Sequence, residues 1–114
     1  MVDVLVVDDN RGFCQLLVSR FELEGYTADM AHDGAEAMEM LNQEGNYQLI
    51  IMDILMPGMD GTSFLNMYKG KIPVMIMTNL EQATYTNQVK VVVKKETASI
   101  EDIVREAKPF LGGM

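Results

Sequence analysis

Residues 49–61 read Leu-Ile-Ile-Met-Asp-Ile-Leu-Met-Pro-Gly-Met-Asp-Gly, an apolar run that leads into a carboxylate and then into a turn. Four consecutive apolar residues are typical of a strand that is covered on both faces, as in a parallel sheet. Pro57 and Gly58 then end any regular element within a few residues. We therefore expect Asp53 at the carboxyl end of a buried strand, which is where open α/β sheets bind their ligands.

The chain has 114 residues and a formal net charge of -8. This length suits a single core, so we expect one domain over residues 1–114. The negative charge argues against direct contact with nucleic acid or an anionic membrane, because both require clustered lysine and arginine. Cys14 is the one cysteine, and we find neither a signal peptide nor a long apolar span. We therefore expect a soluble, cytoplasmic protein.

Apolar runs and helical patterns alternate along the chain. Strands are predicted at residues 2–7, 26–31, 49–53, 72–77 and 89–93. Helices are predicted at residues 11–25, from 33 or 34 to 45, and at 62–68, 80–88 and 99–107, with weak periodicity in the fourth. This alternation through short loops indicates an α/β protein with a doubly wound, five-stranded parallel sheet.

The first predicted helix has one clear packing face. Asn10 is positioned to cap it, and its apolar residues fall at helical spacing. We expect the inward residues to be Phe13, Leu16, Leu17 and Phe21, with Arg20, Glu22 and Glu24 facing solvent. Cys14 lies next to this stripe, where a packed thiol is expected rather than a reactive one.

Polar residues collect at the carboxyl ends of four predicted strands, which share one crevice in such a fold. They are Asp8 and Asp9, Asp53, Thr78, and Lys94 and Lys95. Two carboxylates about 4 Å apart repel by about 4 kcal/mol at an effective dielectric constant of 20, so a cation is needed. Oxygen ligands favour a hard divalent ion, above all Mg²⁺. The threonine and a lysine would then bind an anionic group, which points to phosphoryl transfer to a carboxylate.

Each of these features has an ordinary interpretation when taken alone. A pair of aspartates after a strand is most often a solvated helix cap, Thr78 is a common strand-end residue, and Lys94 suits a solvated strand end. Four strand ends with complementary chemistry are much harder to assign to chance. A small nucleotide or flavin carrier is a further alternative, although Asp8 and Asp9 would repel its phosphate.

The chain resembles the receiver domains of two-component response regulators over nearly its whole length. The matching blocks are Val6 to Asn10, Asp53 to Gly61, Met77 to Leu80, and Val93-Lys94. The resemblance implies the flavodoxin-like strand order 2-1-3-4-5. Compared with the family, the segment between Asp53 and the lysines is short, so a shortened fourth helix is expected.

The resemblance also implies a role for each acidic residue. Asp53 would accept a phosphoryl group from a phosphohistidine on a sensor histidine kinase or a phosphotransfer protein. Asp9 and Asp53 would bind Mg²⁺ through their side chains and Leu55 through its backbone carbonyl. Asp8 would bind the ion directly or through water.

Thr78 and one lysine complete the site that the resemblance implies. The Thr78 hydroxyl and the lysine would contact the phosphoryl oxygens, and Lys94 is narrowly favoured over Lys95. The resemblance implies a signalling phospho-acceptor rather than an enzyme. Phosphorylation would change its contacts with a downstream effector domain or protein, or with a second copy of the chain in a homodimer. The alternative is a receiver-like module that signals by protein contact alone, without phosphate.

Overall fold

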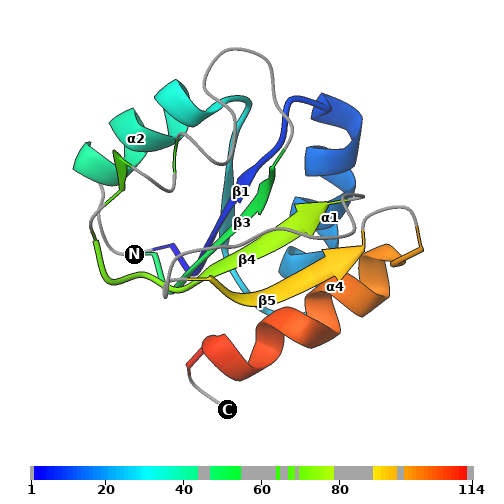
Figure 1. Cartoon of the computed structure of the whole chain (residues 1–114). Helices are drawn as coiled ribbons and strands as arrows, with labels where there is room; N and C mark the ends of the chain where they lie inside the picture. The colour runs from blue at the N-terminus through cyan, green and yellow to red at the C-terminus, as the bar shows by residue number, and fades with distance from the viewer. Residues whose placement is uncertain are drawn as a thin grey trace.

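The computed structural model describes residues 2–43, 47–54, 70–78, 89–94 and 97–112, together with Phe64, Met67 and Tyr68. It contains one five-stranded sheet in the order β2-β1-β3-β4-β5, with every neighbouring pair parallel (Figure 1). The strands are β1 (Val4–Val7), β2 (Ala28–Ala31), β3 (Leu49–Asp53), β4 (Val74–Thr78) and β5 (Val89–Lys94). The predicted fold class and strand order are therefore confirmed.

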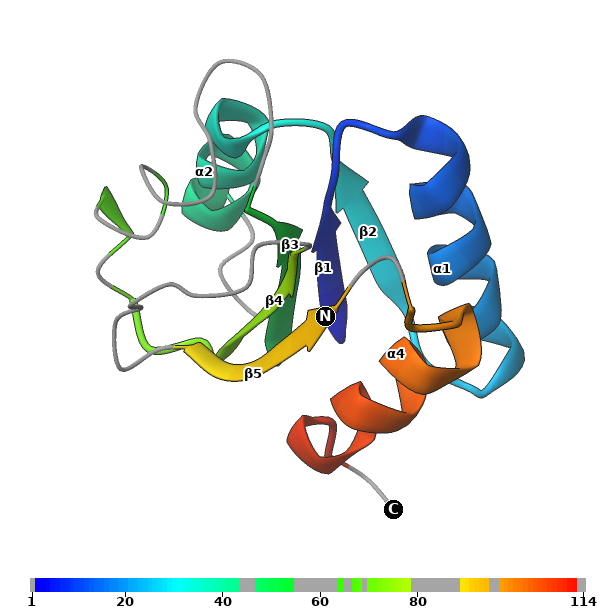
Figure 2. The same ribbon diagram turned by 45° about the vertical axis from the view of Figure 1, so that its right-hand side comes forward.

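Helices cover both faces of this sheet. Figure 2 shows α2 (Gly34–Gln43) on one side, and α1 (Arg11–Leu23) and α4 (Ile100–Ala107) on the other, with η1 (Lys108–Phe110) following α4. Successive strand residues point to opposite faces, so the strands supply two cores. The core under α1 and α4 contains Val4, Val6, Leu49, Ile51, Met75 and Met77, and the core under α2 contains Leu5, Val7, Ile50, Met52, Val74 and Ile76.

Local sequence signals set the ends of the helices. The Asn10 side chain accepts a hydrogen bond from the Phe13 amide at 3.0 Å and so caps α1. Beyond α1, Gly25 has a φ of +93°, a conformation that favours glycine. Ser99 and Asp102 form a reciprocal capping box at the start of α4. These features confirm the predicted starts of α1 and α4.

The predicted packing face of α1 is wrong at Leu16, whose exposed fraction is 63%. The buried stripe is formed by Cys14, Leu17, Val18 and Phe21. These residues follow the i, i+3, i+4, i+7 spacing of one helical face, and Leu16 lies beside that face. Leu23 is also exposed, whereas Arg20 and Glu24, predicted to face solvent, are half-buried.

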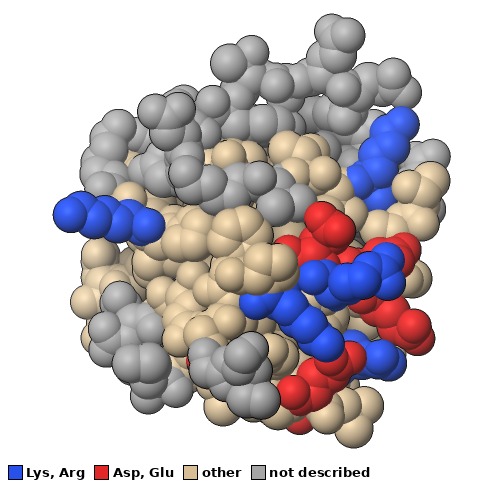
Figure 3. All heavy atoms as spheres, turned by 90° about the horizontal axis from the view of Figure 1, so that it is seen from below, with Lys and Arg blue, Asp and Glu red and all other residues tan. Residues whose placement is uncertain are grey.

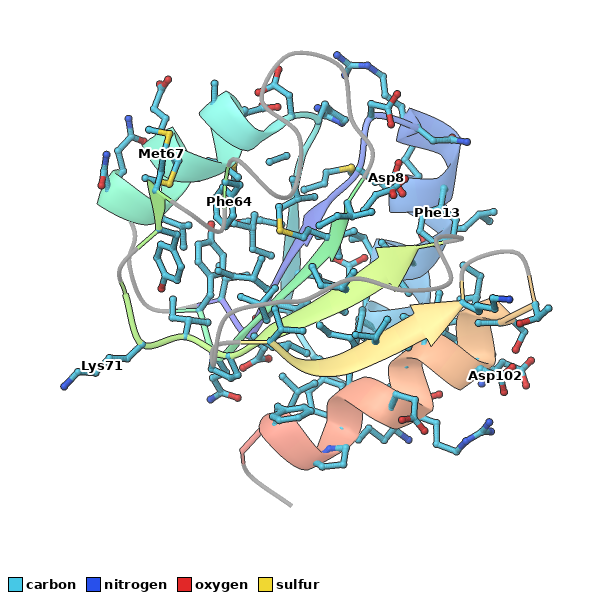
Figure 4. The ribbon with its side chains drawn as sticks, in the orientation of Figure 1. Asp8, Phe13, Phe64, Met67, Lys71 and Asp102 are labelled. Atoms are coloured by element: carbon cyan, nitrogen blue, oxygen red, sulfur yellow. The ribbon has the colours of Figure 1, made fainter. Side chains whose placement is uncertain are left out.

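Two predicted segments lie largely outside the described residues. Only Phe64, Met67 and Tyr68 of the helix predicted at residues 62–68 are described, and the first two are labelled in Figure 4. Phe64 and Tyr68 stack with ring centroids 5.6 Å apart in the core under α2. The segment 80–88, and with it the predicted shortened fourth helix, is not described. Three strands begin two residues later than predicted, namely β1 at Val4, β2 at Ala28 and β4 at Val74, whereas β3 and β5 begin as predicted.

Candidate functional site

Asp8 is fixed at the carboxyl end of β1 by its backbone and its side chain. Its amide donates to the Ala31 carbonyl at 3.0 Å, which extends the pairing of β1 with β2 by one residue. Its Oδ1 atom accepts a hydrogen bond from the Asn10 amide at 2.9 Å, as in an Asx turn. Asp8 is fully buried and lies beside the start of α1 (Figure 4). The turn from β1 to α1 thus places a carboxylate inside the end of the sheet.

Asp53 reaches the same end from the neighbouring strand. It is the last residue of β3 and is 8% exposed. The register pairs Val7 of β1 with Met52 of β3, so the next residues along the two strands, Asp8 and Asp53, lie side by side. The apolar run of β3 is completely buried, which confirms the predicted strand and brings its final carboxylate to the edge of the core.

The carboxylates of Asp8, Asp9 and Asp53 form a cluster. One oxygen atom from each residue can be chosen so that all three lie within 4.8 Å of one another. At that separation each pair of negative charges repels by about 3.5 kcal/mol for an effective dielectric constant near 20. Asp9 is exposed, which leaves the cluster open to solvent on one side. A cation would offset this repulsion.

The donor set of this cluster fits a hard divalent cation. Among the residues that the structure describes, it consists of carboxylate oxygens, with none of the sulfur or imidazole ligands that favour zinc or copper. Mg²⁺ is bound in proteins through one or two carboxylates and completes its shell with water or phosphate oxygens. The solvent side next to Asp9 gives room for such ligands. The residues present therefore suit Mg²⁺.

The other predicted site residues are described only in part. Thr78 ends β4 and pairs with Lys94 of β5, one residue beyond the pairing of Asp53 with Met77. The backbone of both residues therefore reaches the edge of the sheet where the carboxylates lie. Lys94 is exposed. Leu55 and Lys95 lie outside the described residues, so the choice between the two lysines stays open.

One contact to the cluster was not predicted from the sequence. Cys14 is fully buried, as expected of a packed thiol, but its Sγ atom also donates to the Asp8 carbonyl at 3.2 Å. A cysteine in the apolar stripe of a helix fits the hydrophobic periodicity as an alanine or a valine does. This periodicity therefore cannot show that the thiol makes a hydrogen bond.

The family of response regulator receiver domains matches residues 4–104 of this chain. The chain is 35% identical over 80 residues to a transcriptional regulatory protein, a CpxR homolog, of Haemophilus influenzae, and 32% identical over 80 residues to response regulator MprA of Mycobacterium ulcerans. Each match covers 68% of this chain and 34% of the relative. The chain thus spans about a third of the length of these curated relatives.

Solved structures agree over almost the whole chain. The response regulator TrrA of Thermotoga maritima, solved in complex with Mg²⁺ and BeF, has 28% identity and a TM-score of 0.79, with 97% of this chain and 100% of that chain covered. The receiver domain of the hybrid histidine kinase CckA has 26% identity and a TM-score of 0.79, with 96% and 99% covered. Among the described helices of this chain, none is long and apolar enough to cross a membrane.

Proposed function

Because the chain belongs to the family of response regulator receiver domains of two-component systems, we propose that it accepts a phosphoryl group on Asp53 from a sensor histidine kinase or a phosphotransfer protein. The observation that carries the proposal is the cluster of Asp8, Asp9 and Asp53 at the ends of β1 and β3. Asp53 belongs to this cluster and stands at the end of the central strand, where a ligand can approach.

Asp9 and Asp53 hold Mg²⁺ through their side chains in this proposal, with Leu55 contributing its backbone carbonyl and Asp8 acting directly or through water. Support comes from the oxygen-only donor set and from TrrA, a relative solved with Mg²⁺ and BeF. When bound, Mg²⁺ neutralises charge on the phosphoryl oxygens during transfer.

The transfer itself needs one nucleophile and no other covalent chemistry from the chain. A carboxylate oxygen of Asp53 attacks phosphorus, and the O–P bond forms as the P–N bond to the donor imidazole breaks. The electron pair stays on the imidazole nitrogen, which takes up a proton from water. The Thr78 hydroxyl and Lys94, or Lys95 in its place, contact the phosphoryl oxygens. The chain is then a signalling phospho-acceptor that assists only its own phosphorylation and dephosphorylation.

The added charge of about -1.5 to -2 changes the contacts of the domain with a downstream effector domain or protein, or with a second copy of the chain. No direct contact with nucleic acid or membrane is proposed, because the net charge of -8 opposes both. A cytoplasmic location is part of the same proposal and agrees with a chain that has one cysteine. Membership of the receiver family speaks against the nucleotide or flavin carrier.

Intact mass tests the proposal after incubation with acetyl phosphate, with and without Mg²⁺. We expect the wild-type chain to gain the mass of one phosphoryl group only with Mg²⁺, and Asp53→Asn to gain none. The matched control is Asp102→Asn on α4, the same substitution on an element that lies away from Asp8 in Figure 4. It should gain the group as the wild type does.

Two results would contradict the proposal. If Asp53→Asn gains the same mass, the acceptor is another residue. If the folded wild-type chain gains none while it binds Mg²⁺, the phosphate-independent interaction module becomes the better interpretation.

A further inference from the structure

Asp8 is anchored through each of its three polar groups. Its amide donates to the Ala31 carbonyl at 3.0 Å and its Oδ1 atom accepts from the Asn10 amide at 2.9 Å. Its carbonyl oxygen accepts from the thiol of Cys14 at 3.2 Å. The donors of the first two bonds are backbone amides, which almost every residue type could supply. The donor of the third bond is a side chain.

The Cys14 thiol reaches its acceptor from the first turn of α1. The Cys14 amide donates to the Asn10 carbonyl at 3.0 Å, so the helix backbone fixes the position of the Cβ atom. The side chain is fully buried and packs within the core under α1 and α4. A thiol is a weak donor in water, but a hydrogen bond inside a buried core is strengthened by the low local dielectric constant. The bond is therefore well placed to restrict the Asp8 carbonyl.

This carbonyl belongs to the peptide unit that joins Asp8 to Asp9. Because a peptide unit is planar, fixing its oxygen also fixes the direction of the Asp9 amide and so the point from which the Asp9 side chain leaves the backbone. Asp9 is exposed, and repulsion from Asp8 and Asp53 favours its movement toward solvent. A bond that holds the 8–9 peptide opposes this movement.

We propose that Cys14 is a positioning residue for the metal site: its thiol holds the 8–9 peptide so that the Asp8 and Asp9 carboxylates stay within reach of one cation. This inference rests on the proposed function, because it assigns a purpose to the cluster that binds Mg²⁺. The competing explanation is that Cys14 only fills space between α1 and the sheet. In the first explanation the metal site depends on the hydrogen-bond donor at position 14, and in the second the fold depends only on the volume of that side chain.

Substitutions at position 14 separate the donor from the volume. Cys14→Val keeps a similar apolar volume and loses the donor, whereas Cys14→Ser keeps a donor. Val18→Ala is the matched packing control, because Val18 lies one turn further along the same buried face of α1. Should Cys14→Val not fold, Cys14→Ala takes its place, since it also lacks a donor and adds no atoms.

The hydrogen bond from Cys14 to the Asp8 carbonyl is first detected in the metal-free protein, from the ¹³C chemical shift of this carbonyl. We expect this shift to move upfield in Cys14→Val, to stay close to the wild-type value in Cys14→Ser, and to be unchanged in Val18→Ala. A loss of packing alone would leave the Asp8 carbonyl shift in Cys14→Val as it is in the wild type. This reading does not depend on metal binding or phosphorylation.

Mg²⁺ titration followed by amide shifts then measures the consequence. We expect Cys14→Val to bind Mg²⁺ about three- to tenfold more weakly than the wild type, the size of one lost hydrogen bond that supports a metal ligand. Cys14→Ser and Val18→Ala should stay within about twofold of the wild type, although Val18→Ala lowers the free energy of unfolding.

The outcomes distinguish this inference from the proposed function. If the wild type binds Mg²⁺ and Cys14→Val binds it equally well, or if Val18→Ala weakens binding as much, Cys14 has no positioning role while the receiver function stands. If the wild type itself binds no Mg²⁺, the proposed metal site is wrong and the positioning role falls with it.

Discussion

Two groups of charged residues in this chain differ in how their charges are arranged. At the ends of β1 and β3, Asp8, Asp9 and Asp53 approach one another within 4.8 Å. At the end of α1, Glu24 instead forms ion pairs with Arg20 at 3.0 Å and with Lys108 of η1. Figure 3 shows acidic and basic side chains intermingled on the face seen from below. The first group concentrates one sign of charge, and the second alternates the two signs.

The difference is the one expected between the proposed metal site and a contact that only stabilises the fold. A carboxylate beside a basic group stabilises the fold modestly, and it does so without any ligand. Carboxylates beside one another lower the stability of the fold until a cation arrives, and local features that oppose stability tend to mark function. Residue type alone cannot tell the two groups apart, because aspartate and glutamate both carry a carboxylate that is charged near pH 7. The sign of the neighbouring charges does.

The largest effect expected from this comparison is at Asp9. Asp9→Asn should weaken Mg²⁺ binding by about tenfold or more, because it removes a charged oxygen ligand. In EDTA the same variant should raise the free energy of unfolding by about 1 kcal/mol, since one repelling charge is gone from an exposed position. Urea unfolding with EDTA, and titration with Mg²⁺, measure the two effects.

The matched control for Asp9→Asn is Glu24→Gln, which also replaces a carboxylate by an amide. It should lower stability instead of raising it, and it should leave Mg²⁺ affinity unchanged. If both variants change the free energy of unfolding in the same direction, the charges next to Asp9 and Glu24 do not decide how each carboxylate affects stability.

A second prediction concerns the wild-type chain with and without metal. Mg²⁺ at ten times its dissociation constant should raise the free energy of unfolding by about 1.4 kcal/mol, because the ion binds the folded state alone. Thermal unfolding in Mg²⁺ and in EDTA gives the measurement. At the same Mg²⁺ concentration the increase should fall to about 0.4 kcal/mol or less in Asp9→Asn, which binds the ion at least tenfold more weakly. It should persist in Lys108→Met, which alters only the second group. An increase of equal size in Asp9→Asn would place the bound metal elsewhere.

Much of the fold could be predicted because its strands are nearly continuous apolar runs. The residues of β3 before Asp53 are all apolar and all buried, so the position of this carboxylate followed directly from the run. Periodicity identifies strands but not their neighbours, however. The order β2-β1-β3-β4-β5 was expected from the family resemblance rather than from the alternation of apolar and polar residues.

The parts that sequence reasoning missed depend on contacts between elements. Leu16 and Leu17 are equally apolar, and only the position of α1 on the sheet decides that Leu17 is buried and Leu16 exposed. The bond from Cys14 to the Asp8 carbonyl joins a helix to a loop and leaves no pattern in the sequence. The same holds for Lys108, which reaches Glu24 from η1.

A third prediction addresses the helix that supports the second group. Ser99→Ala should lower the free energy of unfolding by about 1 kcal/mol, because the Ser99 side chain accepts from the Asp102 amide at 3.0 Å and caps α4. Mg²⁺ affinity should not change. Ser19→Ala, the same substitution on the exposed side of α1, should be neutral or slightly stabilising. A change in Mg²⁺ affinity in Ser99→Ala would show that the two groups are coupled.

The smallest effect is expected in the pH dependence of the second group. Hydrogen bonds from Lys108 and Arg20 hold the pKa of Glu24 below its ordinary value. A carboxyl group whose pKa is lowered by folding stabilises the fold above its unfolded pKa, about 4.3 for glutamate, and this contribution is lost as the pH falls through the folded pKa. The wild type should therefore exceed Glu24→Gln in free energy of unfolding near pH 7, and the difference should vanish in acid.

The same difference between the two proteins should also shrink in about 1 M NaCl, since Glu24 and Arg20 are only half-buried. Urea unfolding of both proteins across this pH range, in low and high salt, gives the measurement. A difference that stays constant with pH and salt would mean that Glu24 contributes through packing, and the contrast with the acidic cluster would then rest on shape rather than on charge.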